Sequence, residues 1–341
     1  MFSRFKSAAR ILLKGEPKKY QRSPIPAITD EEVAEIKQFF PREKFFIFGH
    51  ARSGTTLLMR LARLHPEVHC NYQAHFFTRQ PLLKSLVNTP DVEEWLTRKS
   101  NRWNQGRDLS PLVLRAAADV ILERDAARAG KSIVGDKSPS STIHGQAVRD
   151  LHAVYPDAKL VYIVRDGRDV LISERFRNFV EESRFLSAED KRIIEDLRKD
   201  QTPFMNGTRS IFTETFIRRV AKGWVTNLQE TEDEGRRLFG EKYFSMRYED
   251  LLAHPFDEMQ KLWEFLGVVS GQSLEKTIME EMASNPDEEW QAQRNGDISS
   301  FLPKGQAGNW ARLFTARDKV IFKEVAGAML VKWGYEKDFE W

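Results

Sequence analysis

A short loop bounded by glycines, set between two apolar stretches, constrains this chain more than any other feature. The loop runs from Gly49 to Thr56 with the sequence G-H-A-R-S-G-T-T, follows the apolar residues 45–48 and opens onto the apolar residues 57–62. This order predicts a strand, a tight loop and a helix, in which backbone N–H groups and the helix dipole together favour a phosphate. The sequence therefore predicts an anion site at the end of a buried strand.

The loop differs in one position from the loops that bind nucleoside triphosphates. Thr55 occupies the place where the pattern G-K-[ST] puts a lysine, and the cation of the loop is instead Arg52. A loop without that lysine is poorly suited to a β/γ-phosphate with magnesium. It remains suited to the phosphate of a different nucleotide.

Buried strand patterns alternate with helical patterns along the chain. Strands are expected at residues 44–49, 132–135, 159–165 and 243–246, and residues 68–77 are expected to be extended. The expected helices lie at residues 30–40 with Asp30 as the cap, and at 55–64, 90–99, 110–129, 144–154, 211–230 and 256–265. This alternation predicts an α/β fold with a central parallel sheet flanked by helices. Ligands then bind at the carboxyl ends of the strands.

Composition narrows the class of protein. The 341 residues are 41% hydrophobic and 30% charged, enough for one large domain, and the net charge of +3 suits a small polyanionic ligand. No basic stripe interleaved with aromatic residues predicts a nucleic-acid partner, and no metal-binding motif is present. The single cysteine, Cys70, excludes an internal disulfide and fits a reducing compartment. No apolar run approaches the roughly 18 residues of a membrane span, so we expect a cytoplasmic protein. Because no metal-binding motif is present, we also expect no bound metal.

Three further segments, taken together with the loop, make its functional interpretation more specific. They are R-D-G-R-D-V-L-I-S at residues 165–173, R-Y-E-D-L at 247–251, and K-G-Q-A-G-N-W at 304–310 followed by F-T at 314–315. Together with the loop, and in this order between about residue 44 and residue 333, they resemble the sulfotransferases that use 3′-phosphoadenosine 5′-phosphosulfate (PAPS). The R-S-G-T-T form of the loop is similar to that of the Golgi carbohydrate and tyrosylprotein branch. Golgi members carry an N-terminal anchor, which we do not find here, so we expect a bacterial-type member.

The resemblance implies a three-layer phosphate-loop fold, PAPS as co-substrate and a set of binding residues. Arg52 is expected to contact the 5′-phosphosulfate, and the residues expected to surround that group are Ser53, Gly54, Thr55 and Thr56. Arg165 and Ser173 are expected to hold the 3′-phosphate, for which a guanidinium is well shaped. The remaining expected contacts are Lys137 in the active site, Tyr248 at the cofactor or in the core, and Lys304 with Gly305 in the C-terminal 3′-phosphate loop. Pro303 stands where the cytosolic members have an arginine.

The general base is the position at which the chain departs from the family pattern. Carbohydrate- and tyrosine-directed members have a glutamate in patterns such as K-E-x-H-F-F, and Gln73 stands there in this chain. If the stretch is extended, His75 points the same way as Gln73, and an imidazole is a suitable base near neutral pH. His75 is therefore either the base or a structural residue; a substrate group or another carboxylate is a third possibility. His50 is expected to be structural or to line the cofactor.

Three functions remain open from the sequence. They are a sulfotransferase acting on a hydroxyl or amine of a small-molecule, carbohydrate or peptide acceptor; a phosphate-loop kinase; and a nucleotide-binding protein without catalysis. One domain is expected at residues 44–341, with a substrate cap near 181–209, after a basic lead-in at residues 1–43. Phe2, Phe5, Ala9 and Leu12 are spaced to line one face of a short helix with basic residues opposite. Such a segment either contacts an anionic membrane, packs on its own domain, or is a frayed end.

Overall fold

A five-stranded parallel sheet forms the centre of the protein. The computed structural model describes residues 22–79, 82–100, 102–141, 144–181, 186–269, 271–284 and 305–341. The sheet has the order β2-β3-β1-β4-β5 and every neighbouring pair is parallel. The strands are β1 (Glu43–Gly49), β2 (Val68–Tyr72), β3 (Ile133–Lys137), β4 (Lys159–Val164) and β5 (Tyr243–Arg247). The predicted α/β fold with a parallel sheet is confirmed.

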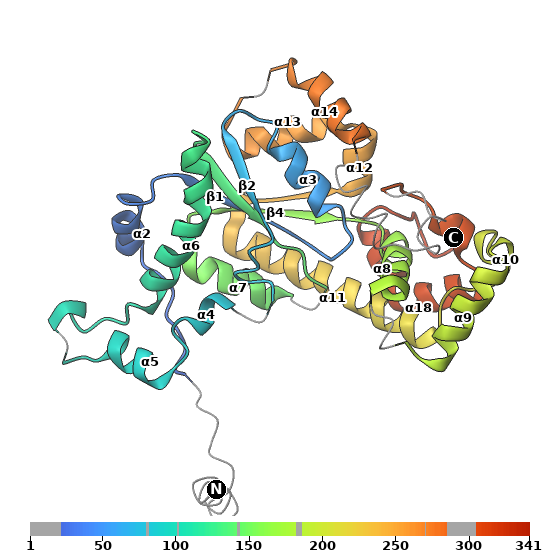
Figure 1. The fold of residues 1–341 in the computed structure, drawn as a ribbon, viewed down its shortest axis with the longest axis horizontal. Helices are drawn as coiled ribbons and strands as arrows, with labels where there is room; N and C mark the ends of the chain where they lie inside the picture. Colours follow the sequence, from blue (N-terminus) through green and yellow to red (C-terminus); the bar gives the residue numbers. More distant parts are fainter. Residues whose placement is uncertain are drawn as a thin grey trace, which may run out of the picture.

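Helices cover both faces of this sheet (Figure 1). One face is covered by α3 (Thr55–Ala62), α12 (Tyr248–Ala253), α13 (Pro255–Leu266) and α14 (Leu274–Ala283). The other carries α6 (Ser110–Arg128), α7 (Gly145–Val154), α8 (Gly167–Glu181), α11 (Glu214–Phe239) and α18 (Ala316–Lys332). The shorter elements are α2 (Asp30–Lys37), α4 (Leu82–Ser85), α5 (Pro90–Thr97), η1 (Arg102–Asn104), α9 (Ala188–Lys199), α10 (Thr202–Met205), η3 (Gly240–Lys242) and α17 (Trp310–Leu313).

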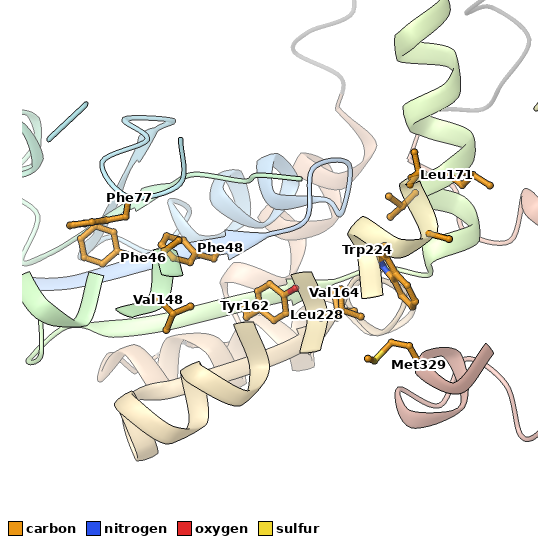
Figure 2. Close-up of a cluster of buried hydrophobic side chains, with 14 of the residues drawn as sticks. Phe46, Phe48, Phe77, Val148, Tyr162, Val164, Leu171, Trp224, Leu228 and Met329 are labelled. Carbon is orange, nitrogen blue, oxygen red and sulfur yellow. The ribbon is translucent and has the colours of Figure 1, made fainter. Parts of the chain in front are cut away.

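Side chains that point alternately to the two faces of the sheet form two hydrophobic cores, one on each face. Phe46 and Phe48 of β1 belong to the core under α7 and α11, whereas their neighbours Phe45 and Ile47 belong to the core under α3 and α13. Successive strand residues point to opposite faces, so an uninterrupted apolar run marks a strand that is buried on both sides. Figure 2 shows the first core, in which Phe46, Phe48 and Tyr162 lie on the same side of the sheet as Val148 and Leu228.

Two local predictions are wrong. The cap of α2 is Thr29, whose hydroxyl accepts the N–H of Glu32 in a capping box, and Asp30 is the first helical residue. Strand β2 ends at Tyr72, so residues 73–77 are not extended; Gln73 and His75 instead have φ angles of 57° and 54°. Within the described residues, no helix is long and apolar enough to cross a membrane.

The turn after β2 has an identifiable cause. The N–H of Ala74 donates to Oδ1 of Asp136 at 2.9 Å, and the N–H of His75 donates to Oγ of Ser138 at 2.8 Å. Side chains from the end of β3 thus take the backbone donors that a continuing strand would have used. Gln73 and His75 therefore do not share one face of a strand, contrary to the sequence-based prediction.

Candidate active site

The glycine loop joins the end of β1 to the start of α3, as predicted. Arg52 and Gly54 have φ angles of 73° and 86°, and a Cβ atom on Gly54 would lie 2.2 Å from the Tyr248 ring. Only glycine fits a position that combines this conformation with such a close approach. Helix α3 begins with no side-chain cap and no acidic residue in its first turn. Its first N–H groups and the positive end of its dipole therefore form the floor of an anion site.

Arg165, directly after β4, ties three segments together. Its Nη1 donates to the backbone oxygen of Arg52 at 3.1 Å, and its Nη2 donates to the backbone oxygen of Gln306 at 2.9 Å. Nε of Arg52 in turn donates to Oγ of Ser173 on α8 at 2.9 Å. The structure thus brings Arg52, Arg165 and Ser173, which are far apart in the sequence, into one contiguous group.

Tyr248 links the glycine loop to the C-terminal loop. Its hydroxyl donates to the backbone oxygen of Gly305 at 2.7 Å, and the Arg165 guanidinium lies 4.9 Å from the centre of its ring. Burial raises the pKa of the Tyr248 hydroxyl, which keeps that group a proton donor. Gly305 therefore lies beside the predicted 3′-phosphate residues, whereas Lys304 and Pro303 lie outside the described residues.

Asp169 and Arg168 hold this loop from the other side. The Asp169 carboxylate accepts the N–H groups of Gly308 at 2.6 Å and Trp310 at 3.1 Å. The Arg168 guanidinium pairs with Asp166 at 2.7 Å and lies 3.5 Å from the centre of the Trp310 ring. Arg168 thus pairs within its own turn, whereas Asp169 holds the distant C-terminal loop, whose Trp310 ring packs on the Arg168 guanidinium.

Lys137 reaches the glycine loop from the end of β3. Its Nζ donates to Oγ1 of Thr56 at 3.2 Å and lies 3.8 Å from the centre of the Tyr72 ring. The lysine is fully buried, whereas the Tyr72 ring above it is 59% exposed. Arg52, Lys137 and Arg165 thus place three cations at the carboxyl edge of the sheet, where negative charge on a ligand is most stabilised.

The two histidines near the loop are both held by short-range contacts. Nδ1 of His75 lies 2.9 Å from Oγ1 of Thr78, and burial, with the charges of Arg79 and Lys137, lowers the pKa of His75 to about 4. Its ring is therefore neutral at neutral pH. Nδ1 of His50 lies 2.9 Å from the backbone oxygen of Ala51, so this nitrogen carries the proton, and burial lowers the pKa of His50 as well.

Two buried polar atoms in the site have no partner. Oγ of Ser53 in the glycine loop and Nε of Arg165 make no hydrogen bond within the described structure. Buried donors are almost always satisfied in folded proteins, so these two atoms are suited to hydrogen-bond an anion in the loop.

Several residues of this site were missed in the sequence. Asp136 and Ser138 fold the turn that carries His75, and burial raises the pKa of the Asp136 carboxyl. Tyr72 covers Lys137. Asp136 and Ser138 flank Lys137 in the segment G-D-K-S-P at residues 135–139, which follows a strand pattern, and only the lysine was predicted to lie in the site. No group of three or more His, Cys, Asp or Glu side chains in the described part of the chain is placed to hold a metal ion.

Comparison with known proteins is consistent with this geometry. A family model described as the sulfotransferase family matches residues 44–272, more than half of the chain. The chain is 23% identical over 227 residues to protein-tyrosine sulfotransferase A of Caenorhabditis elegans, covering 65% of this chain and 49% of the relative. It is 24% identical over 226 residues to the protein-tyrosine sulfotransferase of Drosophila melanogaster, covering 65% and 38%. The chain therefore spans half or less of the length of these curated relatives.

Two similar solved structures illustrate the structural matches. The mouse sulfotransferase SULT7A1 complexed with PAP matches with a TM-score of 0.45 and 15% identity, over 87% of this chain and 88% of the other. Sulfotransferase STF9 from Mycobacterium avium matches with a TM-score of 0.46 and 14% identity, over 88% and 81%.

Proposed function

The chain belongs to the sulfotransferase family, and we propose that it transfers a sulfuryl group from PAPS to a hydroxyl or amine of an acceptor. The observation that carries the proposal is the convergence of Arg52, Lys137 and Arg165 on the glycine loop. The loop lacks the lysine of triphosphate-binding loops, while the cations around it suit a nucleotide with two separate anionic groups.

The residues present fit this co-substrate. Ser53 Oγ and Arg165 Nε are buried donors without partners, and Gly54 leaves the loop open beneath Tyr248. Arg52, Oγ of Ser53 and the N–H groups of residues 54–56 would hold the 5′-phosphosulfate, while the N–H of Ser53 donates to the backbone oxygen of His50 at 3.2 Å. Arg165 and Ser173, with the backbone at Gly305, would hold the 3′-phosphate.

In the transfer, the acceptor atom forms a bond to sulfur while the bond from sulfur to the phosphate oxygen breaks. Charge then grows on the leaving phosphate, and Lys137 and Arg52 are placed to stabilise it without reorganisation. Thr56 orients Lys137 through the bond between its Oγ1 and the lysine Nζ. Lys137 is thus proposed as the residue that stabilises the transition state most directly.

The proton that leaves the acceptor needs a base, and His75 is proposed for that role. Its ring is neutral at neutral pH, and Thr78 fixes its orientation through Nδ1. A base with so low a pKa removes protons best from an acidic acceptor group. The matched relatives are named protein-tyrosine sulfotransferases, so phenolic hydroxyls, in peptides and small molecules, are the first acceptors to test.

Transfer of radiolabelled sulfate from PAPS to a panel of phenols, sugars, amines and tyrosine peptides tests the proposal. The expected result is a labelled product with at least one acceptor and no phosphate transfer from ATP. Binding of adenosine 3′,5′-bisphosphate without turnover on any acceptor would favour the non-catalytic alternative, and phosphate transfer from ATP would favour the kinase.

We also keep a reducing, cytoplasmic location as a proposal. It is supported by the single cysteine, Cys70, which is buried between β2 and α3 and forms no disulfide. Fractionation of the native cells tests it, and recovery of the protein from an oxidising compartment would contradict it.

A further inference from the structure

We propose that residues 335–341, which follow α18, form a strap that holds the 3′-phosphate site in shape, so that docking of the strap and binding of a nucleotide 3′-phosphate are coupled. The strap lies beside α8 and α18 (Figure 1). Trp341 is its main positioning residue. The inference rests on the proposed function, from which the assignment of the 3′-phosphate site comes.

The direction of the strap is set by the end of α18. The N–H of Gly334 donates to the backbone oxygen of Val331 at 3.0 Å, and the N–H of Tyr335 donates to that of Leu330 at 2.9 Å. These two bonds, with Gly334 at a φ of 69°, form the glycine turn that closes many helices. The chain therefore leaves α18 in one fixed direction.

The strap then runs back along α18. Nζ of Lys323 donates to the backbone oxygens of Phe339 at 2.7 Å and Trp341 at 2.8 Å. The Phe339 ring lies against Gly327 in the interior of α18, where a Cβ atom would meet the ring at 2.8 Å. Glycine is normally unfavourable inside a helix. At this position the missing side chain leaves the room that the strap occupies.

At its far end the strap reaches the loop of residues 305–310. The Trp341 ring contacts the Trp310 ring, with their centroids 5.6 Å apart and their planes at 81°. The almost fully buried guanidinium of Arg168 lies 3.5 Å from the centre of the Trp310 ring and 4.5 Å from that of Trp341. Contacts between rings, and between a guanidinium and a ring, stabilise an arrangement of this kind. Trp341 therefore supports the residue whose N–H is already held by Asp169.

Glu336 of the strap takes part in the charge balance of the turn after β4. Its carboxylate pairs with Arg168, which also pairs with Asp166 at 2.7 Å. A buried cation needs such partners, and these two carboxylates hold Arg168 away from a ligand. Arg165, three residues earlier, keeps a buried Nε without a partner in the described structure. The strap thus helps to leave Arg165 as the cation of this turn that meets the nucleotide.

The start of the strap supports Tyr248. The Tyr335 hydroxyl donates to Oε2 of Glu249 at 3.0 Å, and Oε1 of the same carboxylate accepts the N–H of Asp166 at 3.0 Å. Glu249 directly follows Tyr248, whose hydroxyl donates to the backbone oxygen of Gly305. The strap is therefore joined through one carboxylate to both the Tyr248 segment and the turn after β4.

These contacts reach three elements that surround the 3′-phosphate site. They are the turn at residues 165–169, the loop at residues 305–310 and the segment that carries Tyr248. The 5′ group is assigned instead to Arg52 and the start of α3. A displaced strap should therefore disturb the 3′ contacts more than the 5′ contacts. Because such coupling is reciprocal, a bound 3′-phosphate should in turn stabilise the docked strap.

Calorimetry of the full chain with adenosine 3′,5′-bisphosphate and with adenosine 5′-monophosphate tests the inference. Trp341→Ala removes the ring that contacts Trp310, and should weaken bisphosphate binding about tenfold. Gly327→Ala lies outside the site and displaces Phe339, and should weaken it about threefold or more. Monophosphate binding should change little in either variant. Trp341→Phe, which keeps an aromatic ring, should recover most of the affinity, and KM for PAPS should rise in the weakened variants while kcat stays nearly constant.

Matched controls separate the strap from general effects of the same substitutions. Gly223→Ala adds a Cβ atom inside α11, where among the described residues only the backbone oxygen of Ser141 lies within 4 Å, at 3.8 Å. Trp95→Ala removes a half-exposed tryptophan from α5. Both controls should bind the two nucleotides like the unchanged protein.

The outcomes distinguish the inference from the proposed function. If the unchanged protein binds the bisphosphate no more tightly than the monophosphate, the proposed function fails and the inference fails with it. If the unchanged protein prefers the bisphosphate, then unchanged affinity in both Trp341→Ala and Gly327→Ala, or equal losses for the two nucleotides, would overturn the inference alone.

Discussion

Replacement of Gly54 by alanine tests how tightly the glycine loop and Tyr248 are fitted to each other. The new Cβ would lie 2.2 Å from Cδ2 of Tyr248, and the residue would have to keep a φ of 86°. The backbone conformation alone costs an L-residue about 1–2 kcal/mol. Overpacking against a buried ring costs roughly 1–3 kcal/mol more, so the total loss in free energy of unfolding should be about 2–5 kcal/mol.

A second glycine separates these two contributions. Gly106 has a φ of 75°, and a Cβ placed on it would meet no atom within 4 Å. Gly106→Ala should therefore cost only the conformational part, about 1–2 kcal/mol. Urea unfolding of both variants measures the difference, which is the cost of the contact with Tyr248.

The same variants should differ in nucleotide binding. If Cβ of residue 54 displaces the Tyr248 ring, the ring leaves Arg165 and its hydroxyl leaves the backbone oxygen of Gly305. Titration calorimetry with adenosine 3′,5′-bisphosphate should then show at least tenfold weaker binding for Gly54→Ala and none of this loss for Gly106→Ala. In a Tyr248→Ala background the overpacking part should vanish. Equal destabilisation by the two glycine variants, or a cost at Gly54 that Tyr248→Ala leaves unchanged, would refute the reasoning.

Three further predictions concern the charges of the site. Arg52→Ala should reduce turnover by at least about tenfold, since a charge-assisted hydrogen bond contributes roughly 1.5–3 kcal/mol. It should leave the melting temperature unchanged because the side chain is exposed. Unchanged affinity for adenosine 3′,5′-bisphosphate would contradict the assignment of Arg52 to the 5′-phosphate group. Arg165→Ala and Ser173→Ala should weaken binding of adenosine 3′,5′-bisphosphate more than binding of adenosine 5′-monophosphate, and equal losses by calorimetry would show that the pair does not recognise the 3′ group. The pKa of His75 is lowered from 6.5 to about 4 in the folded protein, so between these pH values the unfolded chain binds more protons and the free energy of unfolding falls as the pH drops. His75→Gln should flatten this part of the plot of unfolding free energy, measured with urea, against pH. An unchanged plot would mean that His75 is not the titrating group.

The sheet and the anion loop could be predicted because their signals are local. Strands β1 and β4 contain continuous apolar runs, β3 and β5 begin with shorter ones, and the loop is recognised from eight consecutive residues. The strand order is set by long-range pairing, and no local pattern encodes it. Helices α14 and α18 were not predicted, although Thr315 and Asp318 form a capping box at the start of α18 and Gly334 follows its end. Helix α18 packs mainly against α11.

The binding residues were predictable for a related reason. Each cation directly follows, or ends, a strand: Arg52 lies after β1, Lys137 at the end of β3 and Arg165 after β4. In a parallel sheet the carboxyl ends lie at one edge, and these three residues converge because β3, β1 and β4 are neighbours in the sheet. The contacts between Arg52 and Ser173, and between Arg165 and the Gln306 backbone, follow from that convergence.

The backbone conformation at His75, the proposed base, could not be predicted, and the reason lies in the same segment that supplies a cation. Asp136 and Ser138 flank Lys137, and they fold the residues after β2 by accepting the N–H groups of Ala74 and His75. No periodicity within residues 68–77 reveals an acceptor more than sixty positions away. Burial is the main cause that lowers the pKa of His75 to about 4, and the charges of Arg79 and Lys137 add to it. A single three-residue segment therefore places the cation at the glycine loop, turns His75 away from the strand direction and adds one of the charges that favour its neutral ring. For this reason a substitution at Lys137 should change the ionisation of His75 together with the charge that the loop presents to a nucleotide.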